Sequence, residues 1–579
     1  MQPPLSLVVF TVLPLREGYD RLFRKLAAHP DLDLRAIVVD AYEPPRPSRL
    51  GRLARALARD GAPRLWYKIG RTLAAWVRSA VQGLYEISHP PRSPGISFER
   101  LAGETGVRVL FTPDIHSPET LDAVRGLAPD LGVLCGGRIL SPGLLSLPRR
   151  GTINIHRHKV PDYRGGGPPG YWELLDGAPE LGLTVHYATE RVDAGNVLAE
   201  AAVPIEAFDT LESLRIKAEV LGNELYFETL LRLAREEDPG RPQAPAPGPA
   251  RRAPGPVAEH RLEGMRRKKL SRMPRFRRPR AHWTRTVTGL VKYLAALPFL
   301  LTRRRRLRRA GSAPIVVLYY HTVGNDGESP QALPLEVFAR QVRFLMRHFE
   351  ILSLEEAAHR LASGANATPA AVLTFDDGYA ADLGTSIPFL RYYGIPATFF
   401  LSAGHVETGA PFAHDRALKR PPRPFRVAEA ASLVRMGFAV GSHGLFHERF
   451  AGLSEKEMER VLRASRERLA EWTGAAPRAF AFPGGLWERD LDRKALRKAA
   501  EHYPLACVAW GGYNHPLRST SPAARAPGNG SLRGRVIFRY PAPDNVLELA
   551  WLMDGFTRLR EVLRGNAWGM KDAGEWEEP

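Results

Sequence analysis

Residues 371–378 of this 579-residue chain, Ala-Val-Leu-Thr-Phe-Asp-Asp-Gly, decide the fold of its second half. The apolar run predicts a buried strand that ends in Asp376 and Asp377. Adjacent side chains on a strand point in opposite directions, so one carboxylate can bind a metal while the other faces substrate. His443 and His447 follow at a spacing of four, which suits two imidazoles on one ion. Three protein ligands leave a position open for water, so the pattern predicts a catalytic metal site with one carboxylate free as a base.

Further strand and helix patterns surround this stretch between residues 313 and 579. The loop Phe482-Pro483-Gly484-Gly485 ends one strand, and glycine lets a backbone N–H approach a substrate oxygen closely. Repeating strand-helix units that end in functional residues predict a barrel or distorted barrel with its chemistry at the carboxyl ends of the strands. The predicted strands are Ile315–His321, Ala371–Phe375, Ala397–Ser402, Phe438–Ser442, Arg478–Phe482 and Leu505–Trp510.

Three motifs in order, Thr374–Gly378, Ser442-His443-x-x-x-His447 and Phe482-Pro483-Gly484, resemble the polysaccharide deacetylase family, also called the NodB-homology or carbohydrate esterase 4 group. The resemblance covers about residues 313–545. It implies a distorted (β/α) barrel and metal-dependent hydrolysis of an N-acyl sugar, with Pro483 and Gly484 on the substrate and oxyanion side. It also implies Asp376 as general base and a divalent cation, zinc foremost, held by Asp377, His443 and His447.

The chain departs from this family in one respect. The late Leu-His pair, whose imidazole usually acts as general acid, is missing. His515 is the only late histidine in a suitable loop, and Arg478 is a candidate support for Asp376. The group that protonates the leaving amine is therefore left unassigned.

The first 236 residues alternate apolar strands with helical patterns, which predicts an α/β domain with a mostly parallel, Rossmann-like sheet. Residues 151–156 predict a strand that carries Asn154 and His156 on one face. Asp193 follows in the segment Val-Asp-Ala-Gly. An amide, an imidazole and a carboxylate can together support acyl transfer, because they stabilise an oxyanion and move a proton.

The ordered string Asn154-x-His156, Pro-x-Tyr-Arg164-Gly, Gly-x-Thr-x-His and Asp193-x-Gly resembles the formyltransferase family that includes methionyl-tRNA and sugar N-formyltransferases. The resemblance covers about residues 5–232. It implies 10-formyltetrahydrofolate as donor, Asn154, His156 and Asp193 as catalytic trio, and Arg164 at the substrate. The loop Cys135–Leu140 resembles the folate side of that family, through Gly136, Gly137, Ile139 and Leu140.

Two segments interrupt these domains. Residues 48–88 alternate leucines with arginines at helical spacing, which predicts a basic helical insertion, either packed on the core or facing a membrane surface or an acidic ligand. Arg157, His158 and Lys159 stand where the formyltransferases usually have other residues. These side chains are interpreted either as receivers of an anionic acceptor or as solvated charges.

Residues 237–312 are predicted to link the two domains, first through a flexible Pro-rich stretch and then through a polybasic amphipathic one. Residues 251–309 hold 20 Lys and Arg against two acids, so this segment carries nearly all of the net charge of +20. The apolar run 287–301 is too short to span a bilayer. A peripheral contact with an anionic membrane is favoured, with a nucleic-acid tether and a solvated linker as alternatives.

Composition is that of a globular protein, with 44% hydrophobic and 25% charged residues. Cys135 and Cys507 are too few for a disulfide framework and indicate buried thiols in a reducing compartment. The start of the sequence lacks a basic leader and a cleavage site, which predicts a cytoplasmic protein, peripheral to the inner face of the membrane if the basic segment binds it.

The two halves have complementary chemistry. Hydrolysis of an N-acyl sugar exposes an amine, and a formyltransferase needs an amine as nucleophile. The leading hypothesis is a bifunctional enzyme that replaces an N-acetyl by an N-formyl group on a nucleotide- or lipid-linked amino sugar, in glycan or cell-envelope polysaccharide biosynthesis. Two alternatives remain: a formylase and deformylase pair on a lipid-linked sugar, and a nucleic-acid-binding protein with degenerate enzyme domains. No specific nucleic acid is expected.

Overall fold

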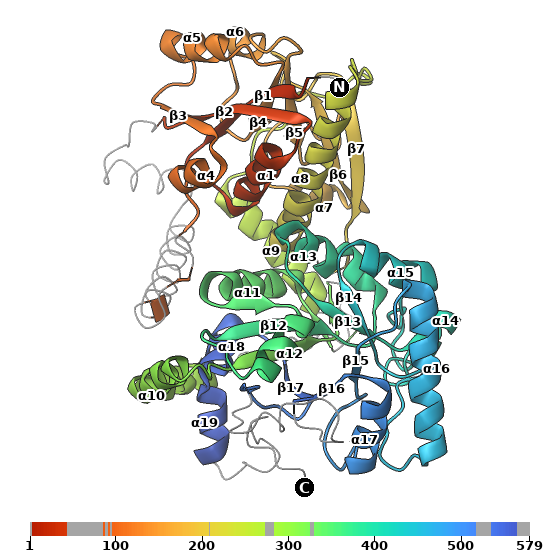
Figure 1. Cartoon of the computed structure of the whole chain (residues 1–579). Helices are drawn as coiled ribbons and strands as arrows, with labels where there is room; N and C mark the ends of the chain where they lie inside the picture. The colour runs from red at the N-terminus through yellow and green to blue at the C-terminus, as the bar shows by residue number, and fades with distance from the viewer. Residues whose placement is uncertain are drawn as a thin grey trace. The chain divides into compact units, whose positions relative to one another are not determined.

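The computed structural model describes residues 3–42, 85–86, 91–92, 95–207, 209–271, 283–324, 329, 331–516 and 534–563. The chain divides into two units, Met1–Met273 and Pro274–Pro579, each with its own core (Figure 1). Most of the predicted insertion at residues 48–88 lies outside the described residues, so its structure stays a prediction.

The first unit is built on a seven-stranded sheet in the order β3-β2-β1-β4-β5-β6-β7. Strands β1 to β5 run parallel, as the alternation of strands and helices predicts, while β6 and β7 are antiparallel additions at one edge. The sequence analysis did not foresee β7. The strands are β1 (Leu5–Val12), β2 (Leu32–Asp40), β3 (Arg108–Thr112), β4 (Leu131–Cys135), β5 (Thr152–His156), β6 (Glu180–Tyr187) and β7 (Val197–Pro204).

Helices cover this sheet because each presents an apolar face to it. The longest is α8, whose first turn is fixed by a reciprocal cap between Thr210 and Ser213. Its Tyr226 is fully buried and donates a hydrogen bond to the Ile153 carbonyl, which locks the helix onto β5. The described helices of the unit are α1 (Glu17–Ala28), α4 (Phe98–Thr105), α5 (Pro118–Leu127), α6 (Pro142–Leu145), α7 (Tyr171–Asp176), α8 (Leu211–Arg235) and α9 (Pro256–Ser271).

The Pro-rich stretch after α8, predicted to be flexible, is instead pinned along the first unit. The backbones of Arg241 and Val197 exchange two hydrogen bonds, and that of Arg251 bonds to Arg164 and Gly166. The guanidinium of Arg251 also lies over the rings of Tyr163 and Trp172, 4.8 and 4.9 Å from their centroids. Composition alone could not reveal these contacts. A Pro-rich segment still has backbone carbonyls, and its other residues also have N–H groups, so it can form hydrogen bonds with the rest of the unit.

The second unit contains a closed parallel barrel of seven strands, β8 and β12 to β17, in which β8 pairs with both β17 and β12. β12 is apolar and fully buried, as expected for a parallel strand covered on both faces. β11 adds to the outside of β12, and β9 pairs with β10 separately. The strands are β8 (Ile315–Tyr320), β9 (Thr322–Val323), β10 (Ala332–Leu333), β11 (Glu350–Leu352), β12 (Ala370–Phe375), β13 (Thr398–Leu401), β14 (Ala439–Ser442), β15 (Ala479–Ala481), β16 (Leu505–Val508) and β17 (Val536–Pro541).

The helices of this unit surround the barrel, and the predicted α/β barrel class is confirmed. A short 3-10 helix, η1 (Ala380–Gly384), follows the aspartate pair. The α-helices are α10 (Trp283–Arg309), α11 (Leu335–His348), α12 (Leu354–Ser363), α13 (Ser386–Tyr393), α14 (Ala403–Thr408), α15 (Val427–Arg435), α16 (Glu455–Thr473), α17 (Arg493–His502), α18 (Val546–Asp554) and α19 (Phe556–Leu563). Among the described helices, none has the length and apolar character needed to cross a membrane.

Candidate active sites

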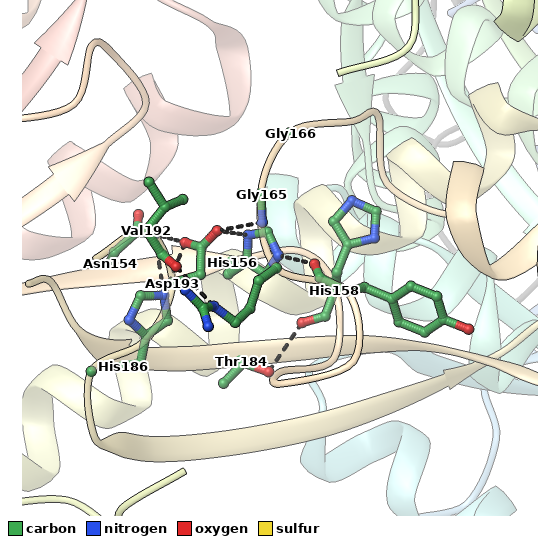
Figure 2. A network of polar contacts seen from close by, with 12 residues as sticks. Asn154, His156, His158, Gly165, Gly166, Thr184, His186, Val192 and Asp193 are labelled. Atoms are coloured by element: carbon green, nitrogen blue, oxygen red, sulfur yellow. Dashed lines mark hydrogen bonds and ion pairs between the residues drawn. The ribbon is translucent and has the colours of Figure 1, made fainter. Parts of the chain in front are cut away.

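The first candidate site lies on β5 and the neighbouring strand β6. Asn154 and His156 point to one face of β5, and antiparallel pairing places His186 directly opposite Asn154. Figure 2 shows Asp193 reaching the same cluster from the turn after β6. Its carboxylate lies 3.4 Å from His156 Nδ1, 3.4 Å from His186 Nε2 and 3.5 Å from Asn154 Nδ2. The structure therefore brings together the predicted trio and adds His186.

The Asp193 carboxylate is held from several sides. The Gly165 N–H donates to its Oδ2 at 2.9 Å, and the Arg164 side chain donates to the neighbouring Val192 carbonyl. Asp193 itself has a φ of +50°, a left-handed conformation that is uncommon outside glycine and asparagine. Gln243 holds the Asp193 carbonyl in turn, at 3.1 Å. Arg164 thus contacts the turn that carries Asp193.

Burial and local contacts together set the protonation states of His156 and Asp193. Desolvation lowers the pKa of His156 to about 4. Burial would raise the pKa of Asp193, but contacts with His186, His156 and the Gly165 N–H lower it to about 2. His156 Nε2 must donate to the Tyr163 carbonyl at 2.7 Å, so its Nδ1 presents a lone pair to an ionised carboxylate. A proton taken from a substrate could therefore be held between His156 Nδ1 and Asp193 Oδ2.

The folate-side loop follows β4 on the next strand of the sheet. Ile139 is 70% exposed, whereas Leu140 is buried. Leu13 and Tyr42, which follow β1 and β2, are also large and exposed. These apolar side chains at neighbouring strand ends offer a surface suited to a flat aromatic ring, so the residues fit a folate donor.

The backbone of this loop takes conformations that favour glycine. Gly136 and Gly137 have φ of +77° and +128°. Arg138, between them and Ile139, is paired to Asp40 at 2.7 Å and to Asp114 at 2.6 Å. These ion pairs tie the loop to the ends of β2 and β3.

Three charged residues after His156 differ in their surroundings. Arg157 donates to Asn223 at 3.0 Å and to the Ala218 carbonyl, so it braces α8 and does not face an acceptor. His158 is buried against Glu173, with 2.8 Å between Nδ1 and Oε1. Lys159 alone is exposed. The predicted anion-receiving role is therefore wrong for Arg157 and His158, because both are already paired inside the unit.

The second candidate site lies at the carboxyl ends of β12 and β14. His443 Nε2 and His447 Nε2 each lie 3.5 Å from Oδ1 of Asp377, and the three ligand atoms could share one ion. Neither carboxylate oxygen of Asp377 has a hydrogen-bond partner in the described structure, although the residue is fully buried. Buried unpaired polar groups are costly, so this set of donors fits a divalent cation.

The two histidines converge through a turn and not through the helical turn that their spacing suggests. His447 has a φ of +61°, and Gly444 between them has +77°. His443 Nδ1 must donate to the Ala481 carbonyl at 2.7 Å, which leaves its Nε2 free to bind metal. Strained backbone at Asp377, with a φ of +72°, marks the same place.

Arg539 on β17 contacts Asp376, the second carboxylate. Its guanidinium donates to Asp376 Oδ1 at 2.6 Å and Oδ2 at 2.9 Å, and it is fully buried. Burial would raise the pKa of Asp376, but the charge of Arg539 lowers it. Asp376 is therefore ionised. In contrast, desolvation raises the pKa of Asp377 to about 6 when no cation is present.

Two sequence predictions around this site are wrong. Arg478 is 70% exposed and pairs with Glu355 at 3.4 Å, because it precedes β15 and so lies at the opposite end of the barrel from Asp376. His515 bonds to the Ser312 carbonyl, also at the amino ends of the strands. Neither can reach the site.

A second network that the sequence analysis missed adjoins the metal-type triad. Tyr379 donates to Asp415 Oδ2 at 2.6 Å, and its hydroxyl lies 2.9 Å from His414 Nε2. The His414 ring is 5.6 Å from that of His447 and is one-third exposed. The only local signal is that Tyr379 directly follows the Asp-Asp-Gly motif.

The glycine loop after β15 is also fixed by a buried acid. Asp490 is fully buried, accepts from the Leu486 N–H at 3.1 Å and lies against Gly484. Gly484 has a φ of +72°, so a side chain there would meet both strain and the Asp490 carboxylate. Asp490 in turn anchors the exposed arginines Arg489 and Arg449, at 2.7 and 3.3 Å.

Comparison with known proteins agrees with this division. Residues 91–230 match the family model for formyl transferase, and residues 363–503 match the model for polysaccharide deacetylase. The chain therefore contains a region similar to formyl transferases, followed by a region similar to polysaccharide deacetylases.

Curated relatives and solved structures resemble separate parts of the chain. The methionyl-tRNA formyltransferase of Citrifermentans bemidjiense is 34% identical over 174 residues, which are 29% of this chain and 54% of that protein. That of Geobacillus thermodenitrificans is 39% identical over 130 residues, 22% and 40% of the two chains. The chain thus spans about half the length, or less, of these relatives. The Streptococcus pyogenes deacetylase PplD in complex with acetate is 19% identical, covering 42% of this chain and 99% of that one at a TM-score of 0.34.

Proposed function

We propose that this chain is a bifunctional enzyme that removes an N-acyl group from an amino sugar in its second unit and formylates an amine in its first. One observation carries the proposal: two separate constellations on one polypeptide each gather the groups that one half-reaction needs. The buried Asp377 with unpaired oxygens, next to an ionised Asp376, supports hydrolysis. Asn154, His156 and Asp193 in mutual contact support acyl transfer.

For the hydrolysis, Asp377, His443 and His447 would hold a divalent cation, with zinc favoured by the two imidazoles. The cation supplies Lewis acidity to the amide carbonyl and to the attacking water. Asp376 accepts the proton of that water, and Arg539 keeps it ionised and oriented. Water adds to the acyl carbon, the C–N bond breaks, and a carboxylate and an amine leave.

The departing amine needs a proton. The network of Tyr379, His414 and Asp415 lies beside His447 and has a partly exposed imidazole. We assign the delivery of that proton to His414, with Asp415 as the buried counter-charge reached through Tyr379. This assignment fills the role for which the sequence offered no residue.

For the formylation, the Ile139 loop would hold 10-formyltetrahydrofolate, which would supply the formyl group. Asn154 donates a hydrogen bond to the oxygen that becomes negative as the amine attacks. The amine loses its proton into the gap between His156 Nδ1 and Asp193 Oδ2. When the bond to the folate nitrogen breaks, that nitrogen would take up the proton held in this gap, which leaves a formamide and tetrahydrofolate.

The substrate class is an amino sugar on an anionic carrier, a nucleotide or a lipid phosphate. Arg449 and Arg489 support this, because both are exposed and fixed by buried Asp490 close to the deacetylase centre. Arg449 follows His447 by two residues, and Asp490 joins both arginines to the Gly484 loop. Buried, unpaired Cys135 and Cys507 suit a reducing compartment, and we place the reaction in the cytoplasm.

The test incubates zinc-loaded full-length protein with N-acetylated sugar nucleotides, lipid-linked N-acetyl sugars and 10-formyltetrahydrofolate, and follows products by mass spectrometry. We expect a formamide from the native protein and a free amine from Asn154→Ala. Asp376→Asn is expected to leave the acetamide intact but to formylate a supplied amine. Absence of amine and formamide across the panel would reject the function.

In one alternative, the first unit adds a formyl group and the second unit later removes it. If the second unit removes formyl groups and not acetyl groups, the same assay shows hydrolysis of an N-formyl sugar and none of its N-acetyl analogue.

A further inference from the structure

Helix α10 is fixed to the second unit by one face only. Tyr293 and Leu300 are buried against Trp551 and Phe556 of α18 and α19, and Figure 1 shows the three helices side by side. The Tyr293 hydroxyl donates to Asp554, which Arg304 also approaches, at 3.9 Å. The rotation of the helix about its axis is therefore set.

The opposite face of α10 is apolar and exposed over its middle turns. Val291 is 62% exposed, Leu294 41% and Phe299 57%. Ala295 and Pro298 are exposed between them, and exposed Lys292 borders this surface two turns before Phe299. Residues three and four apart share a helix face, so these side chains form one continuous apolar surface. Large apolar groups gathered on a surface mark a site of interaction.

The same face becomes cationic in the last turns. Arg305, Arg306, Arg308 and Arg309 are all exposed, and Arg305 and Arg309 continue the line of Val291 and Pro298. Within the described part of the chain, no acidic side chain forms an ion pair with any of these four. Arg304, on the packed side, is the contrast, since it approaches Asp554.

We propose that this face of α10 lies in the interface of an anionic lipid membrane. Its apolar half enters the boundary of the acyl chains, and its arginines contact lipid phosphates. The helix lies on the membrane and does not cross it, in agreement with its internal charges. A nucleic acid would also attract the arginines, but it would leave the exposed Val291, Leu294 and Phe299 without a role.

This inference stands apart from the proposed catalysis, because it requires neither active site. It adds a place for the reaction: α10 leads directly into β8, so a membrane-bound α10 holds the deacetylase barrel against the lipid surface. An amino sugar on a lipid carrier would then be presented to a bound enzyme.

The test is flotation of the full-length protein with vesicles of phosphatidylcholine alone or mixed with phosphatidylglycerol. We expect binding only to the mixed vesicles, and its loss at about 1 M salt, where the Debye length is about 3 Å. Each arginine near an anionic surface accounts for about a fivefold change in partition, so Arg305→Gln with Arg306→Gln and Arg309→Gln lowers it roughly a hundredfold.

Two matched variants separate the membrane from its alternatives. Arg435→Gln with Arg460→Gln and Arg463→Gln removes the same charge from exposed positions on α15 and α16 and is expected to bind as the native protein does. Val291→Ser with Phe299→Ser keeps every charge and is expected to weaken binding about tenfold or more. Circular dichroism checks that each variant is folded.

Three outcomes would overturn the inference. The first is equal binding to neutral and mixed vesicles, and the second is an equal loss in the α15 and α16 variant. The third is tight RNA binding that depends on the α10 arginines but not on Val291 and Phe299, which would make α10 a nucleic-acid contact. Because the readout is partition and not turnover, each result is independent of whether the enzyme assay succeeds.

Discussion

Arg539 offers the sharpest test of the deacetylase site. Replacement by methionine keeps most of the apolar stem but removes the guanidinium that neutralises buried Asp376 through two hydrogen bonds of 2.6 and 2.9 Å. Both partners are buried, and breaking such a pair on one side costs about 3–5 kcal/mol because a charge is left uncompensated. We expect Arg539→Met to lower the unfolding free energy of the second unit by that amount at neutral pH.

The sign of the pH dependence follows from the same pair. Arg539 lowers the pKa of Asp376 in the folded state, so the pair stabilises the fold at neutral pH and this stability is lost as pH falls through that pKa. Without Arg539, only the nearby His443 and His321 oppose the effect of burial, so the pKa of Asp376 should rise. A general base must be ionised, so the acid limb of kcat/KM for deacylation should move towards neutral pH.

The assays are urea unfolding and pH-rate profiles of zinc-loaded protein, with zinc content measured to show that the triad survives. Arg478→Met is the matched control, since this side chain is exposed and, within the described structure, forms an ion pair with Glu355 alone; the change should alter stability by less than about 0.5 kcal/mol. An unmoved acid limb together with a loss of stability below about 1 kcal/mol in Arg539→Met would refute the role of the pair.

Four further changes test the remaining residues. His443→Ala should abolish zinc binding and deacylation but leave formyl transfer to a supplied amine intact, by metal analysis and mass spectrometry; loss of both activities would contradict separate sites. His414→Gln should lower kcat for deacylation about a hundredfold at unchanged zinc content, the usual size of a general-acid contribution. Because the pKa of His156 is about 4, the first unit should lose about 3 kcal/mol between pH 6.5 and 4, and His156→Gln should flatten that loss in acid unfolding. Glu173→Leu leaves His158 buried without its partner and should cost about 1–3 kcal/mol, most of which His158→Leu in the same chain should restore.

The sequence alone predicts those candidate site residues that are close to one another along the chain. Asp376 and Asp377 directly follow the apolar strand β12, as predicted, but Asp377 has a φ of +72°, so strand alternation does not set their directions. Asn154 and His156 share a face of β5 because every second side chain of a strand points to the same side. These local rules placed the aspartates, the histidines and the β5 pair correctly at strand ends.

The sequence could not reveal groups that barrel closure brings together. Arg539 lies 163 residues after Asp376, and only the pairing of β17 with β8 carries it to the site. A lone arginine within the apolar run 536–540 was the available signal, because a charge inside a buried strand needs a partner. Arg478 is close to the Phe482-Pro483-Gly484 motif in the sequence and is for that reason a candidate partner of Asp376. It precedes β15, however, so it lies at the opposite end of the barrel.

The buried carboxylates of the two sites are stabilised differently, and the difference supports the proposal of a metal in the second site only. Asp193 receives the Gly165 N–H and contacts two imidazoles, so its charge is stabilised by the protein alone and its pKa falls to about 2. Asp377 is more deeply buried than Asp193 and has no hydrogen-bond partner among the described residues, and its pKa rises to about 6. A buried anion without a donor is stable only beside a cation, and Arg539 is already engaged by Asp376. These features support the proposal that a divalent ion held by Asp377, His443 and His447 would supply the missing positive charge.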